Sequence, residues 1–219
     1  MLITFSGMDG AGKTTQINKL MSKLGNQKKD VIYIWARGGY TPGFELLKKT
    51  IRKVFGKSIP KAGNSKVRTK IISRPFVSWV WLNIAIIDMA ILYGVIVRLK
   101  LLFGDFVICD RYIDDTVLDF KLNFPDINFE KMFLWNLLKF VAPRPKKSFL
   151  CLIPVDVSMQ RSLQKNEPFP DSKETLLRRL NSYHDEILFS REKYFVIDGT
   201  KNIHEVESMI LQVIGRDVL

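Results

Sequence analysis

A glycine-rich stretch near the start of the chain places the strongest constraint on its fold. The stretch reads Gly7-Met8-Asp9-Gly10-Ala11-Gly12-Lys13-Thr14-Thr15 and fits the pattern G-x-x-x-x-G-K-[ST]. A short apolar strand precedes it, and apolar residues follow it at helical spacing, at Ile17, Leu20, Met21 and Leu24. A strand, a glycine-rich turn and a helix N-terminus together form a phosphate-binding loop, or P-loop. The sequence therefore predicts nucleotide binding by a P-loop ATPase or kinase.

The residues of the P-loop have distinct expected roles. Lys13 would neutralise the β- and γ-phosphates of ATP, and the Thr14 hydroxyl would ligate Mg²⁺. The helix dipole adds about half a positive charge where a phosphate would lie. The expected ATP-binding residues are Gly7, Gly10, Ala11, Gly12, Lys13, Thr14 and Thr15.

The chain is basic, with a formal net charge of +12. This charge could serve nucleic acid, an anionic membrane surface or a polyphosphate site. The densest basic segment, Lys57 to Arg74, has no aromatic residue for stacking on bases, so we expect no specific nucleic-acid binding. Cys109 and Cys151 lie in apolar strand-like runs without metal or redox spacing. Buried thiols and the absence of a signal-peptide pattern predict a cytoplasmic protein.

One segment, Phe76 to Val97, is nearly all apolar and carries a single charge, Asp88. Its length would allow it to cross a bilayer. A span would separate the P-loop from the next strand, although the two strands must be neighbours for the P-loop to work. We therefore expect a buried helix, with a second subunit as a further cover, and so a homodimer without a transmembrane segment.

Five apolar strands alternate with helices along the chain. The strands are expected at residues 2–5, 31–35, 106–109, 149–153 and 194–197. The second strand is wholly apolar, as in a sheet covered on both faces. Expected helices include Phe129 to Val141 and one that Asp156 caps and that runs to about Gln164. This order predicts an α/β fold with a doubly wound, five-stranded parallel sheet.

Three further features favour a kinase. Asp110 ends the third strand, where a carboxylate would hold Mg²⁺ and its waters. Arg111 follows and could bind an acceptor phosphate in bidentate fashion. A break at 164–173 has Arg161 and Lys165 on its near side, and a basic lid there would exclude water and place charge on the transferred group. The alternatives are a strand-end salt bridge and a plain surface connection. No N-K-x-D motif is present, which argues against a GTPase.

These motifs resemble those of the thymidylate kinases over nearly the whole chain. The family carries G-x-D/E-G-A-G-K-T/S-T, as at 7–15, and D-R-Y after its third strand, as at 110–112. Its R-E-P-G-G-T-like loop is similar to 37–43, and residues 196–199 also match. The resemblance implies a P-loop fold of the nucleoside monophosphate kinase type, one domain over 1–219 with a short lid at about 161–175.

The same resemblance implies residue roles. Asp9 would contact the acceptor's sugar and Arg111 its phosphate. The implied catalytic residues are Lys13, Arg111, Arg161 and Lys165, with the last two acting from the lid because the P-loop contains no arginine. The implied acceptor residues are Asp9, Arg37, Asp88, Arg111, Tyr112 and Asp119. The metal would be held by Thr14 and Asp110.

The acceptor half of the chain departs from the family pattern. The family reads thymine with F-x-x-D-R, where this chain keeps Asp88 but has Ala85 for the phenylalanine and Met89 for the arginine. Methionine cannot donate a hydrogen bond to a base. Trp81, one turn earlier, could stack instead or belong to the core. After D-R-Y the family continues with S-x-x-A-Y-Q, and Asp119 takes the place of the tyrosine.

We therefore expect ATP- and Mg²⁺-dependent phosphoryl transfer to a small phosphorylated or hydroxylated acceptor, with thymidylate first by resemblance. Two alternatives remain at this point. One is a different acceptor, such as another nucleotide, a sugar or a glycan precursor, for which the basic charge could allow docking at an anionic membrane surface. The other is an ATP-binding protein without transfer activity.

Overall fold

The structure is a computed structural model that describes residues 1–26, 30–36, 75–165, 171–187 and 194–215. Its contacts divide the chain into two compact units. The first unit comprises Met1–Trp35, Leu99–Leu118 and Arg144–Leu219, and the second comprises Ala36–Arg98 and Asp119–Pro143. The prediction of one domain stays a prediction, and we describe each unit by itself.

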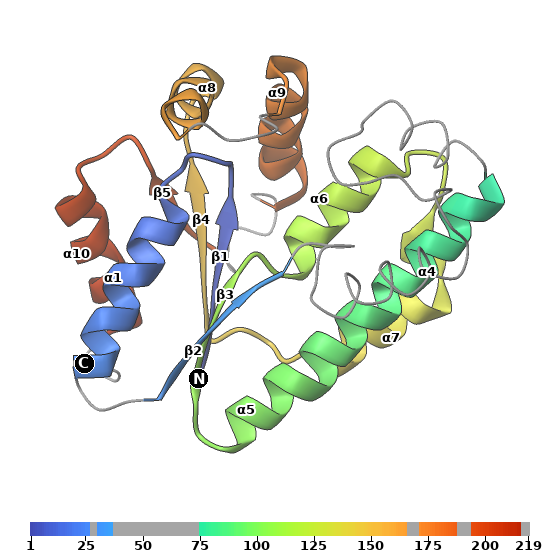
Figure 1. Cartoon of the computed structure of the whole chain (residues 1–219), viewed down its shortest axis with the longest axis horizontal. Coiled ribbons are helices and arrows are strands. Elements are labelled where there is room, and N and C mark those ends of the chain that lie inside the picture. Colours follow the sequence, from blue (N-terminus) through green and yellow to red (C-terminus); the bar gives the residue numbers. More distant parts are fainter. Residues whose placement is uncertain (27–29, 37–74, 166–170, 188–193, 216–219) are drawn as a thin grey trace. The chain divides into compact units, whose positions relative to one another are not determined.

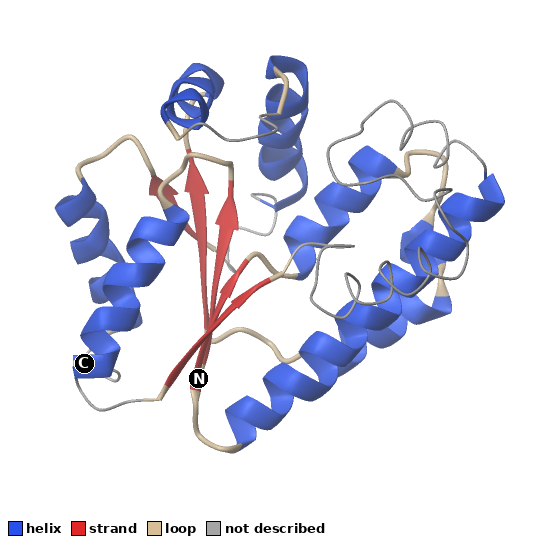
Figure 2. Cartoon of the chain, viewed as in Figure 1, coloured by secondary structure: helices blue, strands red, loops and turns tan. Residues whose placement is uncertain are grey.

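A parallel sheet of five strands forms the centre of the first unit (Figure 1). Its order is β2-β3-β1-β4-β5, and every neighbouring pair runs parallel. The strands are β1 (Leu2–Gly7), β2 (Val31–Trp35), β3 (Phe106–Asp110), β4 (Lys147–Leu152) and β5 (Phe195–Asp198). The predicted fold class is confirmed, since strands and helices alternate around an all-parallel sheet (Figure 2).

Burial differs between the middle and the edges of this sheet. Every residue of β1 is buried, and β3 and β4 are nearly so. The expectation that the second strand is covered on both faces was wrong, because β2 is an edge strand whose Tyr33 and Trp35 side chains are exposed. An edge position leaves side chains on the open margin of the sheet in contact with solvent, however apolar the strand.

Helices flank the sheet in this unit. They are α1 (Lys13–Asn26), α5 (Arg98–Leu102), α6 (Ile113–Asn123), α8 (Val155–Gln164), α9 (Lys173–Ser182), the π-turn η4 (Tyr183–Ile187) and α10 (Ile203–Ile214). Two of these helices cross the boundary between the units, since Arg98 of α5 and the residues of α6 from Asp119 onward belong to the second unit. The predicted apolar stripe of α1 is confirmed, with Ile17, Leu20 and Leu24 buried against the sheet core. Because β1 and the apolar side of α1 are buried in the core, both ends of the P-loop between them are held in position.

The second unit is built on the long apolar helix. It contains α4 (Pro75–Ile91), the π-turn η2 (Leu92–Val97), the end of α6, the 3₁₀ turn η3 (Phe129–Lys131) and α7 (Phe133–Val141). Helix α4 packs against α7. Phe120, Phe129 and Trp135 form an edge-to-face aromatic cluster with ring centroids 5.0 to 6.0 Å apart. Such pairs favour one packing arrangement over others.

The helix predicted at Phe76 to Val97 is confirmed, but it is not wholly buried. Its buried side includes Leu82, Ile86 and Met89, whereas Phe76 and Ile91 are more than half exposed. In the described part of the chain, the helix Pro75–Leu102 is the one segment long and apolar enough to cross a membrane. A third of its most apolar stretch of 18 residues is buried inside the protein. Length and composition therefore do not separate a membrane segment from a partly covered core helix.

Two smaller expectations were wrong. The predicted helix Phe129 to Val141 is interrupted at Met132, which has extended dihedral angles of φ −71° and ψ 141°. Asp156 does not cap α8, because Pro154 holds the cap position with φ −58° and Asp156 lies in the first turn. Proline fixes φ at this value, which suits the start of a helix. Asp156 still places negative charge near the positive end of the helix dipole.

Candidate functional site

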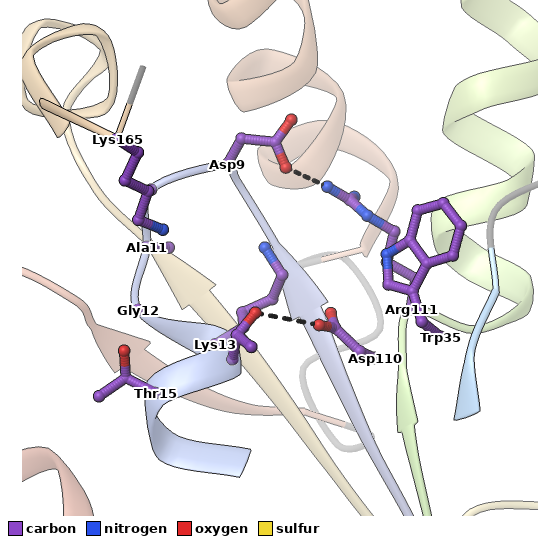
Figure 3. A pocket seen from close by; sticks show the side chains of 11 residues that line it. Asp9, Ala11, Gly12, Lys13, Thr15, Trp35, Asp110, Arg111 and Lys165 are labelled. Atoms are coloured by element: carbon purple, nitrogen blue, oxygen red, sulfur yellow. Dashed lines mark hydrogen bonds and ion pairs between the residues drawn. The ribbon is translucent and has the colours of Figure 1, made fainter. Parts of the chain in front are cut away.

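The P-loop lies at the carboxyl end of β1, the central strand of the sheet. In open α/β sheets, ligands bind outside the carboxyl ends of strands, where the strand order reverses. Gly10 and Gly12 have φ of 78° and 84°, in the left-handed region that favours glycine. A pocket opens here, and Figure 3 shows the side chains around it. Its lining residues are Asp9, Gly10, Ala11, Gly12, Lys13, Thr14, Thr15, Trp35, Asp110, Arg111 and Lys165.

Lys13 is buried at the base of this pocket. Its Nζ donates to the carbonyl oxygens of Gly7 and Met8, at 3.0 and 2.7 Å. Burial lowers the pKa of the ammonium, and the nearby Arg111 charge lowers it further. A desolvated cation that is held mainly by neutral carbonyls gains more from a phosphate than a solvated one does. The geometry therefore suits the role expected of Lys13.

Thr14 and Asp110 meet beside Lys13. The Thr14 hydroxyl donates to Asp110 Oδ2 at 3.3 Å, and the Tyr33 hydroxyl donates to the same oxygen at 3.2 Å. Tyr33 was not singled out from the sequence, since an aromatic residue in an apolar strand gives no functional signal. Among the described residues, no group of three or more His, Cys, Asp or Glu side chains could hold a metal. Mg²⁺ in phosphoryl-transfer sites needs only one or two protein oxygens besides phosphates and water, so Thr14 and Asp110 fit it.

Arg111 lines the same pocket, on the side of Asp110 and across from Lys165 (Figure 3). Its Nη2 pairs with Asp9 Oδ1, as the dashed line in Figure 3 shows. Arg111 is buried and Asp9 is part-exposed. The structure thus brings together two residues expected at the acceptor. It also gives Arg111 a φ of 78°, unusual for a residue with a side chain.

The inner face of the Arg111 guanidinium contacts residues that the sequence did not single out as functional. Its Nη1 lies 3.4 Å from Asp115 Oδ1 and 3.5 Å from the Tyr183 hydroxyl. Asp115 also accepts a hydrogen bond from the Ser6 hydroxyl at 2.6 Å. Burial raises the pKa of Tyr183 well above its usual value, so this phenol stays protonated. Asp115 follows Arg111 by four positions in the chain, and this spacing of opposite charges was the available sequence signal.

Helix α8 holds the P-loop from outside. Arg161 Nη1 donates to the carbonyls of Gly10 and Gly199, each at 2.9 Å, and the Ser158 hydroxyl donates to the carbonyl of Asp9 at 2.7 Å. Gly199 approaches the loop closely, since a Cβ there would lie 2.6 Å from the carbonyl oxygen of Ala11. Arg161 thus supports the backbone of the P-loop. Its expected contribution to the transferred phosphoryl group stays a prediction.

Lys165 follows α8 directly, and its side chain lines the pocket (Figure 3). It is exposed, as expected for a cation that acts from a lid. Residues 166–170 of the predicted lid lie outside the described residues. Among the described residues that line the pocket, Lys165 is the cation on the side where the lid is expected.

The other expected acceptor residues are placed as follows. Tyr112 is buried in the first unit, where its backbone N–H donates to Asp115. Asp88 and Asp119 belong to the second unit, and Arg37 lies outside the described residues. Met89 is fully buried on the inner side of α4. The roles of these residues stay predictions.

Comparison with known proteins agrees with this geometry. The family model described as thymidylate kinase matches residues 91–210, more than half of the chain. The chain belongs to the thymidylate kinase family. This membership confirms a phosphotransferase with the P-loop kinase fold, as the site predicts.

Individual relatives cover both the P-loop and the acceptor half. The chain is 25% identical over 217 residues to the thymidylate kinase of Thermosipho africanus (strain TCF52B), which covers 99% of this chain and 98% of the relative. It is 27% identical over 215 residues to that of Sulfurihydrogenibium sp. (strain YO3AOP1), with 95% and 94% covered. A shorter match of 163 residues to the enzyme of Bartonella quintana (strain Toulouse) reaches 31% identity, with 73% and 66% covered.

Proposed function

We propose that this member of the thymidylate kinase family transfers the γ-phosphate of ATP to thymidylate, giving thymidine diphosphate and ADP. The observation that carries the proposal is one pocket in which Lys13 and Thr14 of the P-loop meet Asp110 and Arg111 from the carboxyl end of β3. A P-loop alone serves many hydrolases, but an arginine facing the same pocket would provide a second phosphate site. Family membership supplies thymidylate as the first acceptor.

The residues divide the work between the two phosphates. The backbone N–H groups of the P-loop and Lys13 would hold the β- and γ-phosphates of ATP. Thr14 and Asp110 would hold Mg²⁺, which when bound reduces the charge on those phosphates. Transfer needs positioning and charge stabilisation and no covalent enzyme intermediate.

The acceptor would be held from the opposite side. Arg111 would bind its phosphate, and Asp9, next to that arginine, would accept from its sugar hydroxyl. Lys165 would add positive charge from the lid side as the phosphoryl group moves. Arg37, Asp88, Tyr112 and Asp119 would complete the acceptor site.

The test is ADP release from MgATP with a panel of acceptors. The panel contains thymidylate, uridylate, the other monophosphates, thymidine and simple sugars. Fastest turnover with thymidylate supports the proposal. Turnover with another acceptor only, or slow hydrolysis with none, would overturn it, since the pocket would then serve a different substrate.

We also propose a cytoplasmic homodimer that forms through the exposed side of α4 and η2. Phe76, Trp79, Ile87, Ile91 and Val95 recur there at helical spacing and are 44 to 74% exposed. A row of large apolar side chains in water favours association.

Sedimentation velocity tests the dimer. The wild-type chain should sediment as a dimer, and Ile91→Glu should shift it toward monomer. Leu163→Glu is the matched control, since Leu163 is an exposed leucine on α8. A wild-type chain that is monomeric at every concentration would refute the proposal.

A further inference from the structure

Arg111 uses its two terminal nitrogens in different directions. Nη1 faces inward, toward the Gly7 carbonyl, Asp115 and Tyr183, at 3.4 to 3.5 Å. Nη2 is paired with Asp9 at the pocket. The inward nitrogen cannot bind a ligand without leaving these partners. A phosphate in the pocket would therefore meet the Nη2 side of the guanidinium.

Asp115 is the centre of the inward contacts. It is 2% exposed and accepts hydrogen bonds from the Ser6 hydroxyl, the Tyr112 N–H and the Tyr183 hydroxyl, at 2.6, 3.2 and 2.7 Å. Buried carboxylates need such partners, and several fixed donors hold the carboxylate in one orientation. Asp115 thereby joins the end of β1 to the start of α6.

Tyr183 supplies the second part of the arrangement. Its side chain is fully buried, and its hydroxyl lies within reach of both Asp115 and the Gly7 carbonyl. Its single proton favours Asp115, the shorter and charge-assisted bond. The oxygen is then oriented to accept from Arg111. Tyr183 thus closes a ring of contacts around one side of the guanidinium.

The two carboxylates beside Arg111 differ in exposure. Asp9 is 29% exposed, whereas Asp115 is 2% exposed and tied to several donors. An arriving phosphate can displace Asp9 at the pocket, but it cannot displace Asp115. Arg111 also has a left-handed backbone, a conformation that persists only where its surroundings fix it.

We propose that Asp115, supported by Tyr183, is a positioning residue that fixes Arg111 so that its Nη2 side receives the acceptor phosphate. The inference rests on the proposed role of Arg111. In the family pattern S-x-x-A-Y-Q, which places the tyrosine at Asp119, position 115 is a serine. The carboxylate, with its charge against Arg111, is thus a departure of this chain from that pattern.

The test compares Asp115→Asn with Asp114→Asn. Asparagine keeps the shape of the side chain but removes its charge. We expect Asp115→Asn to raise the KM for thymidylate on the order of 10²-fold, as misplacement of a binding group does. The dissociation constant of ATP, measured by calorimetry, should change by less than about 3-fold. Asp115 touches the P-loop at its first residue, where it accepts from the Gly7 N–H at 3.5 Å, whereas Ser158 and Arg161 hold the loop at Asp9 and Gly10. Asp114→Asn is the matched control, since Asp114 precedes Asp115 on α6 and pairs with Tyr194.

Tyr183→Phe keeps the proposal testable if Asp115→Asn does not fold. It removes one hydroxyl and should raise the KM for thymidylate about 10-fold, with ATP binding unchanged. In the Asp115→Asn background it should add little, since both changes loosen the same arginine.

Three outcomes would overturn the inference. The first is an unchanged thymidylate KM in folded variants, and the second is an equal loss of ATP and thymidylate binding, which indicates a merely structural role. The third is a wild-type chain without turnover of thymidylate, which removes the proposed function and this inference together. If the wild type turns over thymidylate and Asp115→Asn has the same KM for thymidylate, the inference fails but the proposed function stands.

Discussion

The Thr14 hydroxyl donates to Asp110 Oδ2 at 3.3 Å, although 96 positions separate the two residues in the chain. β1 and β3 are parallel neighbours, with Phe5 paired to Asp110, so the residues that follow β1 meet the carboxyl end of β3. The order of strands thus places a hydroxyl and a carboxylate together at the pocket. This pairing is what the metal site of a P-loop kinase requires.

Replacement of Lys13 by alanine should abolish phosphoryl transfer. The ammonium is buried in the pocket, and loss of one such group costs on the order of 10³-fold in rate. ADP release measures the effect, and a cooperative urea transition shows that the fold is retained. Lys19→Ala is the matched control, because Lys19 on the same helix pairs with Glu207 outside the pocket. Full activity of Lys13→Ala would refute the P-loop assignment.

Replacement of Tyr33 by phenylalanine should weaken metal binding. The phenol orients the Asp110 carboxylate, and loss of such an outer partner lowers metal affinity about 10-fold. The measurement is Mn²⁺ binding to the ADP complex by electron paramagnetic resonance. Equal affinity in the variant and the wild type would contradict the placement of Mg²⁺ at Asp110.

Replacement of Gly199 by alanine should displace the P-loop backbone at Ala11. The added Cβ would lie 2.6 Å from the Ala11 carbonyl oxygen and 2.9 Å from Ile153 Cγ2. We expect a loss of about 1–3 kcal/mol in the free energy of unfolding and a higher KM for ATP.

The control for this change is Gly25→Ala. A Cβ at Gly25 meets nothing within 4 Å, and this glycine lies in α1. Alanine there should leave stability unchanged or slightly higher, because glycine is a poor helix former. If both substitutions change the free energy of unfolding and the KM for ATP equally, the clash at Gly199 does not affect the P-loop.

Replacement of Met89 by arginine, the residue of the family motif, should destabilise the chain. Met89 is fully buried, and an unpaired buried charge costs about 3 kcal/mol or more. The midpoint of urea unfolding measures the loss, and Met89→Leu, with a cost below about 1.5 kcal/mol, is the control. A stable arginine variant with tighter thymidylate binding would instead show that position 89 faces the base.

The two cysteines should make the fold sensitive to alkali. Burial raises the pKa of the Cys109 and Cys151 thiols from 9.0 to about 12. Their contribution to stability is complete below pH 9. Between pH 9 and 12 the unfolded chain releases protons that the folded chain keeps, so the free energy of unfolding falls as pH rises.

The slope is about 1.4 kcal/mol per pH unit for each thiol. Urea unfolding at pH 8 to 11 measures it, and the double variant C109A/C151A should lose stability less steeply. Identical slopes in the wild type and the double variant would show that these thiols ionise in the folded chain.

The local patterns of the chain were enough to predict the order of its five strands, although helix α6 was not singled out. β2 begins and ends where the apolar run 31–35 does, and α10 follows its apolar stripe. The P-loop, Asp110 and Arg111 were also predicted, because each stands next to a strand end that the sequence marks. Such patterns arise between residues a few positions apart, so they are visible in one dimension.

The sequence by itself thus determined the P-loop, the alternating α/β order and the family resemblance. Only the tertiary structure decided that β2 is an edge strand, that Arg161 supports the backbone of the P-loop, and that Asp115 and Tyr183 hold Arg111. Arg161 and Gly10 are 151 positions apart, and Tyr183 and Asp115 are 68 apart. Their contacts depend on how strands and helices pack, and no local spacing of residue types records that packing.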